Sequence, residues 1–149
     1  MADPAAQAAP APRHLWAVGI ASLVWNTVIA MDYAMTQARF AAYTSRFPEA
    51  HLAYFFSFPV WAQAAWAISQ WAAVAGSVLL LMRRGAAVSA FWIALMAMIL
   101  PSLYDFTLAD VSASETAGFF ATAFSAVTAI VAVLLLYYAI TQRANGTLR

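Results

Sequence analysis

The sequence predicts an all-α integral membrane protein, a four-helix bundle whose helices run alternately up and down through the bilayer. Two observations predict this fold. Of the 149 residues, 65% are hydrophobic and only 9% are charged, whereas soluble domains carry about 25% charged residues. In addition, four apolar stretches are long enough to cross the hydrocarbon layer, which takes roughly 20 residues of helix. The side chains of these stretches are therefore expected to face lipid.

The first predicted span covers about 15–36 and follows a tail at 1–13 that is rich in alanine and proline. This composition is typical of a disordered segment. The apolar stretch is too long for the core of a cleaved signal peptide, so we expect it to remain as the first helix.

The second and third spans are predicted at about 59–82 and 86–104. Only Arg83, Arg84 and Gly85 separate them, so the two helices must be antiparallel neighbours. Pro59 is expected in the first turn of its helix, where proline is tolerated. Pro101 lies inside the third span and should kink that helix or loosen its last turn.

The fourth span is predicted at about 116–140 and is followed by a short tail at 142–149. The predicted bundle thus occupies 14–141 of the chain. Its boundaries follow from apolar length alone, which places a helix end only to within a few residues.

The arginines predict the orientation of the bundle. If the helices alternate, five arginines fall on one side, namely Arg13, Arg83, Arg84, Arg143 and Arg149. Arg39 and Arg46 fall on the other side. Cytoplasmic loops carry the excess of basic residues, so we expect both termini in the cytoplasm and the protein in a bacterial inner membrane.

The long outer loop, about 37–58, is unusually aromatic. Its aromatic residues are Phe40, Tyr43, Phe47, Tyr54, Phe55, Phe56 and Phe58. Aromatic rings are stable in the headgroup region, so the loop is interpreted first as an interfacial segment. The alternative interpretation is a lid over a cavity that opens outward.

Polar side chains inside the predicted spans are candidate site residues, because an unpaired polar group in hydrocarbon costs several kcal/mol. Asn26 and Gln70 fall near mid-membrane on neighbouring helices. Gln63, Gln70 and Ser77 repeat every seven residues on one predicted helix face. An Asn26–Gln70 hydrogen bond would join the helices at about 0.6–2 kcal/mol. Alternatively, these residues line a polar cavity.

A second candidate site lies at the outer ends of the first and third helices. There the pair Asp32–Tyr33 and the pair Tyr104–Asp105 are predicted at similar depth. Arg39 and Arg46 follow in the outer loop. One interpretation is a rim of interfacial carboxylates paired with these arginines, and the other is a substrate or proton site at an outer mouth.

Several kinds of chemistry are excluded or disfavoured. The chain has no cysteine, which excludes thiol nucleophiles and cysteine-held metals. Its two histidines, His14 and His51, fall on opposite sides of the predicted membrane, which disfavours a bis-histidine haem or a histidine-based zinc site. There is no glycine-rich phosphate loop. The interpretation leans away from an enzyme, with no cofactor or metal expected. The net charge of +1 gives no argument for a nucleic-acid partner, and none is expected.

Several stretches resemble those of a known group of proteins. They are DYAMTQARFAAYTSRF from Asp32, LAYFFSFPVWAQAAWA from Leu52, GSVLLLMRR from Gly76, and AFW from Ala90. The chain resembles small uncharacterised bacterial four-helix membrane proteins that are similar in shape to DoxX-like proteins. Some of them carry an automatic label of sugar transporter. The resemblance implies the fold and a bacterial setting, and it implies no particular binding residues.

Three functional hypotheses follow. The first is a small accessory or carrier protein that works as a homo-oligomer or beside a membrane-protein partner. The second is a small-solute transporter in which Asn26, Gln70 and Asp32 contact the substrate. The third is a lipid- or quinone-binding redox accessory subunit, with Trp25, Trp66 and Trp71 flanking a flat apolar ligand.

Overall fold

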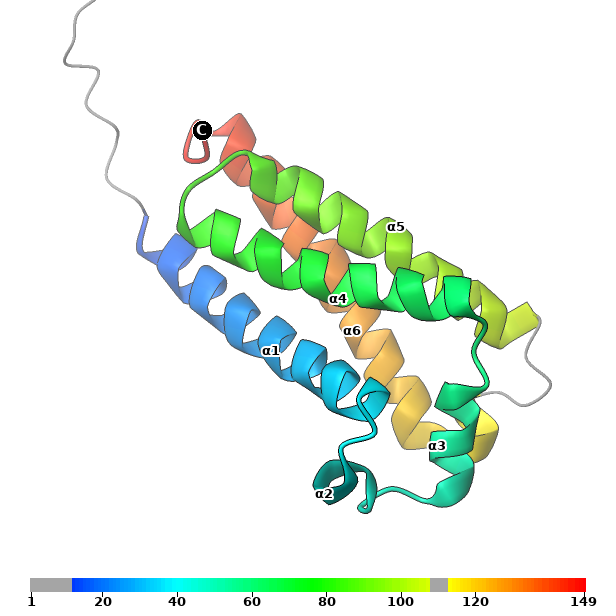
Figure 1. Cartoon of the computed structure of the whole chain (residues 1–149). Coiled ribbons are helices and arrows are strands. Elements are labelled where there is room, and N and C mark those ends of the chain that lie inside the picture. The colour runs from blue at the N-terminus through cyan, green and yellow to red at the C-terminus, as the bar shows by residue number, and fades with distance from the viewer. Residues whose placement is uncertain (1–11, 108–112) are drawn as a thin grey trace, which may run out of the picture.

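The predicted all-α four-helix bundle is confirmed. The computed structural model describes residues 12–107 and 113–149. Its long helices are α1 (Arg13–Gln37), α4 (Val60–Leu81), α5 (Ala86–Thr107) and α6 (Ala113–Ala144) (Figure 1). Each contains a segment that is long and apolar enough to cross a membrane. The chain is therefore a multi-pass membrane protein whose helices contact lipid. Most of the tail predicted at 1–13 lies outside the described residues.

Two short helices, α2 (Ala41–Thr44) and α3 (Glu49–Phe56), occupy the connection between α1 and α4. The long helices differ from the predicted spans mainly at their ends. Pro12 and Pro59 stand at the N-cap positions of α1 and α4, just before the first turn, where the missing proline N–H costs nothing. Helix α5 continues through Pro101 to Thr107. Apolar length shows where lipid ends, whereas a helix can continue into the interface.

Helix α4 is the central element of the bundle, because it packs most extensively against α5 and also against α1. Helix α6 packs against α5 and contacts α3. Two glycines permit the close approaches of α4. A Cβ on Gly76 would lie 2.7 Å from the ring of Phe91 in α5, and a Cβ on Gly19 of α1 would lie 2.5 Å from the Leu81 side chain.

The two ends of the bundle differ. The start of α1, the α4–α5 turn and the C-terminal residues gather at one end (Figure 1), here called the basic end after Arg13, Arg83, Arg84, Arg143 and Arg149. The other end, called the loop end, holds α2 and α3. The five-to-two separation of arginines expected from alternating helices is thus present in the fold.

The last five residues, 145–149, fold back onto the α4–α5 turn and are called the C-terminal clamp. The backbone N–H of Arg149 donates to the carbonyl of Arg83 at 2.9 Å, and the N–H of Gly85 donates to the carbonyl of Arg149 at 2.6 Å. Leu148 is buried. The segment predicted as a tail at 142–149 is therefore folded, because Leu148 finds an apolar site beside the turn.

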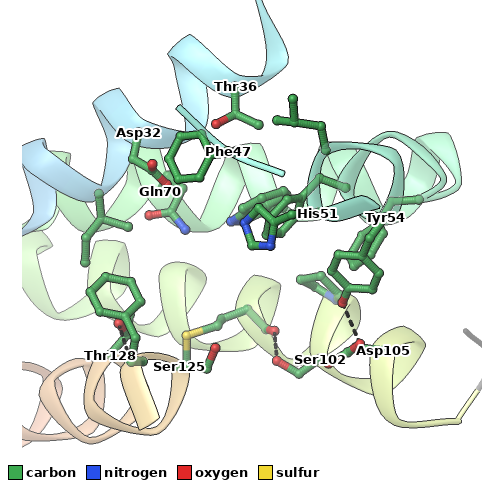
Figure 2. A pocket seen from close by; sticks show the side chains of 18 of the residues that line it. Asp32, Thr36, Phe47, His51, Tyr54, Gln70, Ser102, Asp105, Ser125 and Thr128 are labelled. Carbon is green, nitrogen blue, oxygen red and sulfur yellow. Dashed lines mark hydrogen bonds between the residues drawn. The ribbon is translucent and has the colours of Figure 1, made fainter. Parts of the chain in front are cut away.

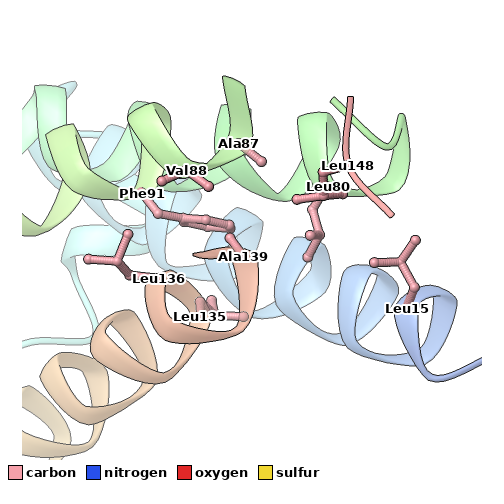
Figure 3. Close-up of a cluster of buried hydrophobic side chains, with 9 residues drawn as sticks. All are labelled: Leu15, Leu80, Ala87, Val88, Phe91, Leu135, Leu136, Ala139 and Leu148. Atoms are coloured by element: carbon pink, nitrogen blue, oxygen red, sulfur yellow. The ribbon is translucent and has the colours of Figure 1, made fainter. Parts of the chain in front are cut away.

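A core of apolar side chains fills the basic end of the bundle (Figure 3). It consists of Leu15, Leu80, Ala87, Val88, Phe91, Leu135, Leu136, Ala139 and Leu148. At the same end, His14 of α1 and the hydroxyl of Tyr138 in α6 form a hydrogen bond of 2.6 Å. The helices are thus closed against one another at this end.

Candidate binding cavity at the loop end

A cavity of about 730 Å³ lies between the helices in the half of the bundle nearer the loop end (Figure 2). All four long helices and the α1–α4 connection contribute to its wall. It extends inward to Gln70, which is halfway along α4. Its volume falls within the range of roughly 300–1,000 Å³ that is typical of small-molecule sites.

One side of the cavity is formed by α1 and α4. Ile29, Asp32 and Thr36 of α1 line it, and their spacing of three and four residues places them on one helix face. Trp66 and Gln70 of α4 line it from one turn apart. Gln70 thus lies in a cavity wall together with Asp32, as a polar site would require (Figure 2).

The other side is formed by α5 and α6, which contribute hydroxyl groups. Ser102 of α5 and Ser125 and Thr128 of α6 line the cavity (Figure 2). The hydroxyl of Ser102 donates to the Met98 carbonyl at 3.0 Å, and that of Thr128 donates to the Phe124 carbonyl at 2.9 Å. Because these protons are committed to the backbone, both hydroxyl oxygens act as acceptors toward the cavity.

The loop end of the cavity is covered by a row of stacked rings. Phe47 stacks on His51 with ring centroids 5.6 Å apart, and His51 meets the edge of Phe55 at 4.8 Å. Phe55 in turn stacks on Trp66 of α4 at 5.1 Å. All four residues line the cavity. Of the two interpretations of the aromatic loop, this geometry favours the cover over a cavity.

Two tyrosines of the connection hold the two carboxylates of the cavity. The hydroxyl of Tyr43 donates to Asp32, and that of Tyr54 donates to Asp105. One of the two interpretations of the sequence paired these carboxylates with Arg39 and Arg46, but Arg39 lies over the ring of Phe56 at 4.3 Å. The connection therefore contacts these carboxylates with neutral phenols, because the aromatic residues fold inward.

Burial and the nearby charge of Asp32 determine the protonation states of Tyr43 and His51 in the connection. Burial, the hydrogen bond to Asp32 and the negative charge of Asp32 together raise the pKa of Tyr43 to about 12, while the charge of Arg46 acts in the opposite direction. Burial lowers the pKa of His51, against the charge of Asp32. Tyr43 is therefore a neutral donor, and His51 contributes no positive charge to the cavity at neutral pH.

Asn26 does not bond to Gln70, in contrast to the expected pair. Its Nδ2 donates to the Ser77 hydroxyl at 2.9 Å and to the Ala73 carbonyl at 3.3 Å. Asn26 and Ser77 are both buried, and neither lines the cavity. They join α1 to α4 by a polar contact, which lies closer to the basic end than Gln70 because Ser77 is about two turns further along α4.

Three other predicted site residues, namely Gln63, Tyr33 and Tyr104, contact the aromatic cover or the residues beside it. The side chain of Gln63 donates to the Phe58 carbonyl at 2.7 Å, and the Tyr33 hydroxyl donates to the Gln63 carbonyl at 3.3 Å. Tyr104 meets the rings of Phe58 and Trp61 at 5.0 and 5.8 Å. Gln63, Gln70 and Ser77, which were predicted to share one helix face, thus have three different roles.

Five polar residues of the cavity were missed by sequence reasoning: Thr36, His51, Ser102, Ser125 and Thr128. A signal existed for His51, because Phe47, His51 and Phe55 are spaced four residues apart, which places them on one face of a helix. The hydroxyl residues carried no such signal, since serine and threonine in apolar helices commonly bond their own backbone.

The cavity has its mouth on the α6 side. Phe120 and Phe124 line it, yet their exposed fractions are 78% and 42%. Nearer the basic end, Phe124 meets the ring of Trp25 in α1 at 6.0 Å. The indole N–H of Trp25 finds no hydrogen-bond partner within the described ranges.

No protein-family model matches the chain, and the comparisons with curated proteins and with solved structures give no match either.

Proposed function

We propose that the protein is a small-solute carrier of a bacterial inner membrane that binds its solute in the cavity at the loop end. The observation that carries this proposal is the cavity of about 730 Å³ with polar groups from all four long helices. A bundle whose polar residues only held the helices together would be expected to fill this volume with side chains, since protein interiors are close-packed. Gln70 and Asp32 in the wall support the solute-binding hypothesis over a purely structural role.

The basic end is proposed to face the cytoplasm, because five of the seven arginines gather there and basic residues favour that side. The cavity then opens to the outer half of the membrane. The bacterial setting is supported by the resemblance of the chain to small bacterial four-helix proteins.

The closed core at the basic end bears on how a carrier of this size would work. A solute bound at Gln70 has no passage through that core in this conformation. We therefore propose that movement across the whole membrane involves a second copy of the chain or a partner membrane protein, which would also cover part of its exposed apolar surface.

The absence of cysteine allows a direct test by single-cysteine labelling. Gln70→Cys and Thr128→Cys should react with N-ethylmaleimide, a small reagent that enters membranes, because both positions line the cavity. Ser77→Cys is the matched control within α4, since Ser77 is fully buried and lies outside the cavity. With a membrane-impermeant maleimide applied to intact cells, Arg84→Cys should react only after the membrane is opened.

Failure of both cavity cysteines to react, with Ser45→Cys in the exposed connection reacting normally, would refute an accessible cavity. Reaction of Arg84→Cys with the impermeant maleimide in intact cells would reverse the proposed orientation. Native mass spectrometry of the purified protein would report its oligomeric state and any small molecule retained by it.

A further inference from the structure

The charged side chains that line the cavity in the described part of the chain are acidic. Asp32 and Asp105 line the cavity, and its described lining residues include no arginine. Arg39 is held over Phe56, which is not part of the wall. Among the described lining residues the one basic side chain is His51, which is uncharged at neutral pH because burial lowers its pKa. The described wall therefore presents two carboxylates and no guanidinium to the cavity, and Arg46, whose charge acts on Tyr43, lies outside the wall.

The structure shows one of these carboxylates in a position to bind a ligand. Asp32 accepts the Tyr43 hydroxyl and is half-buried in the wall. A carboxylate has about four lone-pair positions, so one phenol leaves it able to accept further donors. A carboxylate that is half shielded from water is stabilised when a positive charge comes close.

The rest of the wall suits an apolar or aromatic group. Phe47, His51, Phe55 and Trp66 present their rings along the cover of the cavity. Ring faces attract cations as well as apolar groups, with the cation within about 6 Å of the ring centroid. Aromatic rings beside a carboxylate thus match a ligand that has an apolar body and a positive head.

We propose that the ligand of this cavity is an amphipathic organic amine in its ammonium form, with Asp32 as its counter-ion. The ammonium group donates hydrogen bonds to Asp32, and the hydroxyl oxygens of Ser125 and Thr128 and the amide oxygen of Gln70 are further acceptors in the same cavity. The apolar body lies against Phe55 and Trp66. This inference rests on the proposed function and names its ligand class.

Three compounds with one skeleton and different charge provide the test: phenylbutylamine, phenylbutanol and phenylbutyrate. Binding to the full chain in a non-ionic detergent is measured by isothermal titration calorimetry at neutral pH. The amine should bind more tightly than the alcohol by roughly tenfold or more, which corresponds to a hydrogen bond to a charged group. The carboxylate compound should bind most weakly because Asp32 and Asp105 repel it.

Two charge-removing variants test whether Asp32 is responsible for the tighter binding of the amine. Asp32→Asn removes the charge but keeps the shape, so amine binding should fall about tenfold while phenylbutanol binding stays unchanged. Glu49→Gln removes an equal charge from an exposed position at the start of α3 and should change neither. A similar loss in both variants would indicate long-range attraction and overturn the role of Asp32.

The outcomes separate this inference from the proposed function. Equal binding of the alcohol and the amine, blocked for both by Gln70→Trp, would leave a solute site but overturn the cationic ligand. Tight binding of phenylbutyrate would overturn it as well. Absence of binding by all three compounds, together with unreactive cavity cysteines, would refute the carrier proposal itself. The wild-type series decides the ligand charge even if Asp32→Asn does not fold.

Discussion

At the scale of single residues, the polar side chains of the spans divide into those that join helices and those that line the cavity. Asn26 has its amide bonded to Ser77 and Ala73 and so contributes to stability. Gln70 and Asp32, at comparable or shallower depth, face open space. Removing a residue of the first kind should change stability, and removing one of the second kind should change binding.

Asn26→Leu should lower the free energy of unfolding by about 1 kcal/mol, the usual range for interhelical polar contacts in membranes. The loss arises because the Ser77 hydroxyl and the Ala73 carbonyl lose the amide donor. Unfolding in mixed micelles would measure it, and a double-mutant cycle with Ser77→Ala should show coupling. Additive effects of the two substitutions would contradict the contact.

His51 should make stability depend on pH. Its pKa is lowered in the fold by burial, so the unfolded chain takes up a proton first as the pH falls. The stabilising contribution is complete above the unfolded pKa of about 6.5 and is lost as the pH falls through the lowered folded value. The melting temperature in detergent should therefore decrease between pH 7 and pH 5.

His51→Gln should flatten this part of the pH profile, because glutamine does not titrate. His14→Gln provides the comparison, since His14 is exposed at the basic end. A profile that keeps its slope in His51→Gln would show that another group is responsible.

At the scale of elements, the glycines of α1 and α4 let the helices approach closely at the basic end, and the rings of the connection cover the loop end. Helix α4 takes part in both, because it carries Gly76 against Phe91 and Trp66 against Phe55. The position of α4 therefore determines both the packing of the core and the width of the cavity.

Gly76→Ala should destabilise the bundle by about 1–3 kcal/mol, the usual cost of overpacking, because the new Cβ would lie 2.7 Å from the Phe91 ring. Combining it with Phe91→Leu should recover part of the loss relative to Phe91→Leu alone. Ala75→Val, on the exposed side of the same helix, should have little effect. Melting curves in detergent would compare all four proteins.

At the scale of the whole molecule, the bundle is closed at the basic end and hollow at the loop end. The C-terminal clamp contributes to the closure, since Leu148 joins the core formed by four helices. Leu148→Ala should cost about 2 kcal/mol and expose the α4–α5 turn to proteases. Arg149→Ala is the matched control, because its contacts with Arg83 and Gly85 use only the backbone.

The fold could be predicted from the sequence because lipid imposes simple requirements. The spacing of Arg83, Arg84 and Gly85 predicted the α4–α5 hairpin, and apolar length predicted four helices. The partner of Asn26 could not be predicted in this way. Depth was known only to a few residues, and the partner depends on how each helix is rotated about its axis.

The site was harder to predict because it is assembled by the connection. The depth of Asp32 and Gln70 in the spans predicts them as site residues, and both line the cavity. His51 lies in a segment without membrane-spanning length, and only the inward fold of α3 brings it to the wall. Whether Asp105 meets a tyrosine or an arginine likewise depends on that fold, which no local pattern of residues reveals.

The exposed phenyl rings at the mouth beside α6 also determine where the relevant concentration of ligand is found. An amphipathic compound reaching this opening arrives from among the acyl chains, so its occupancy follows moles of compound per mole of lipid rather than molarity in water. Diluting the sample with more vesicles at constant total compound should lower occupancy, whereas adding buffer alone should hardly change it for a strongly partitioning compound. Dose–response curves from preparations with different lipid contents should then coincide only when plotted against membrane mole fraction.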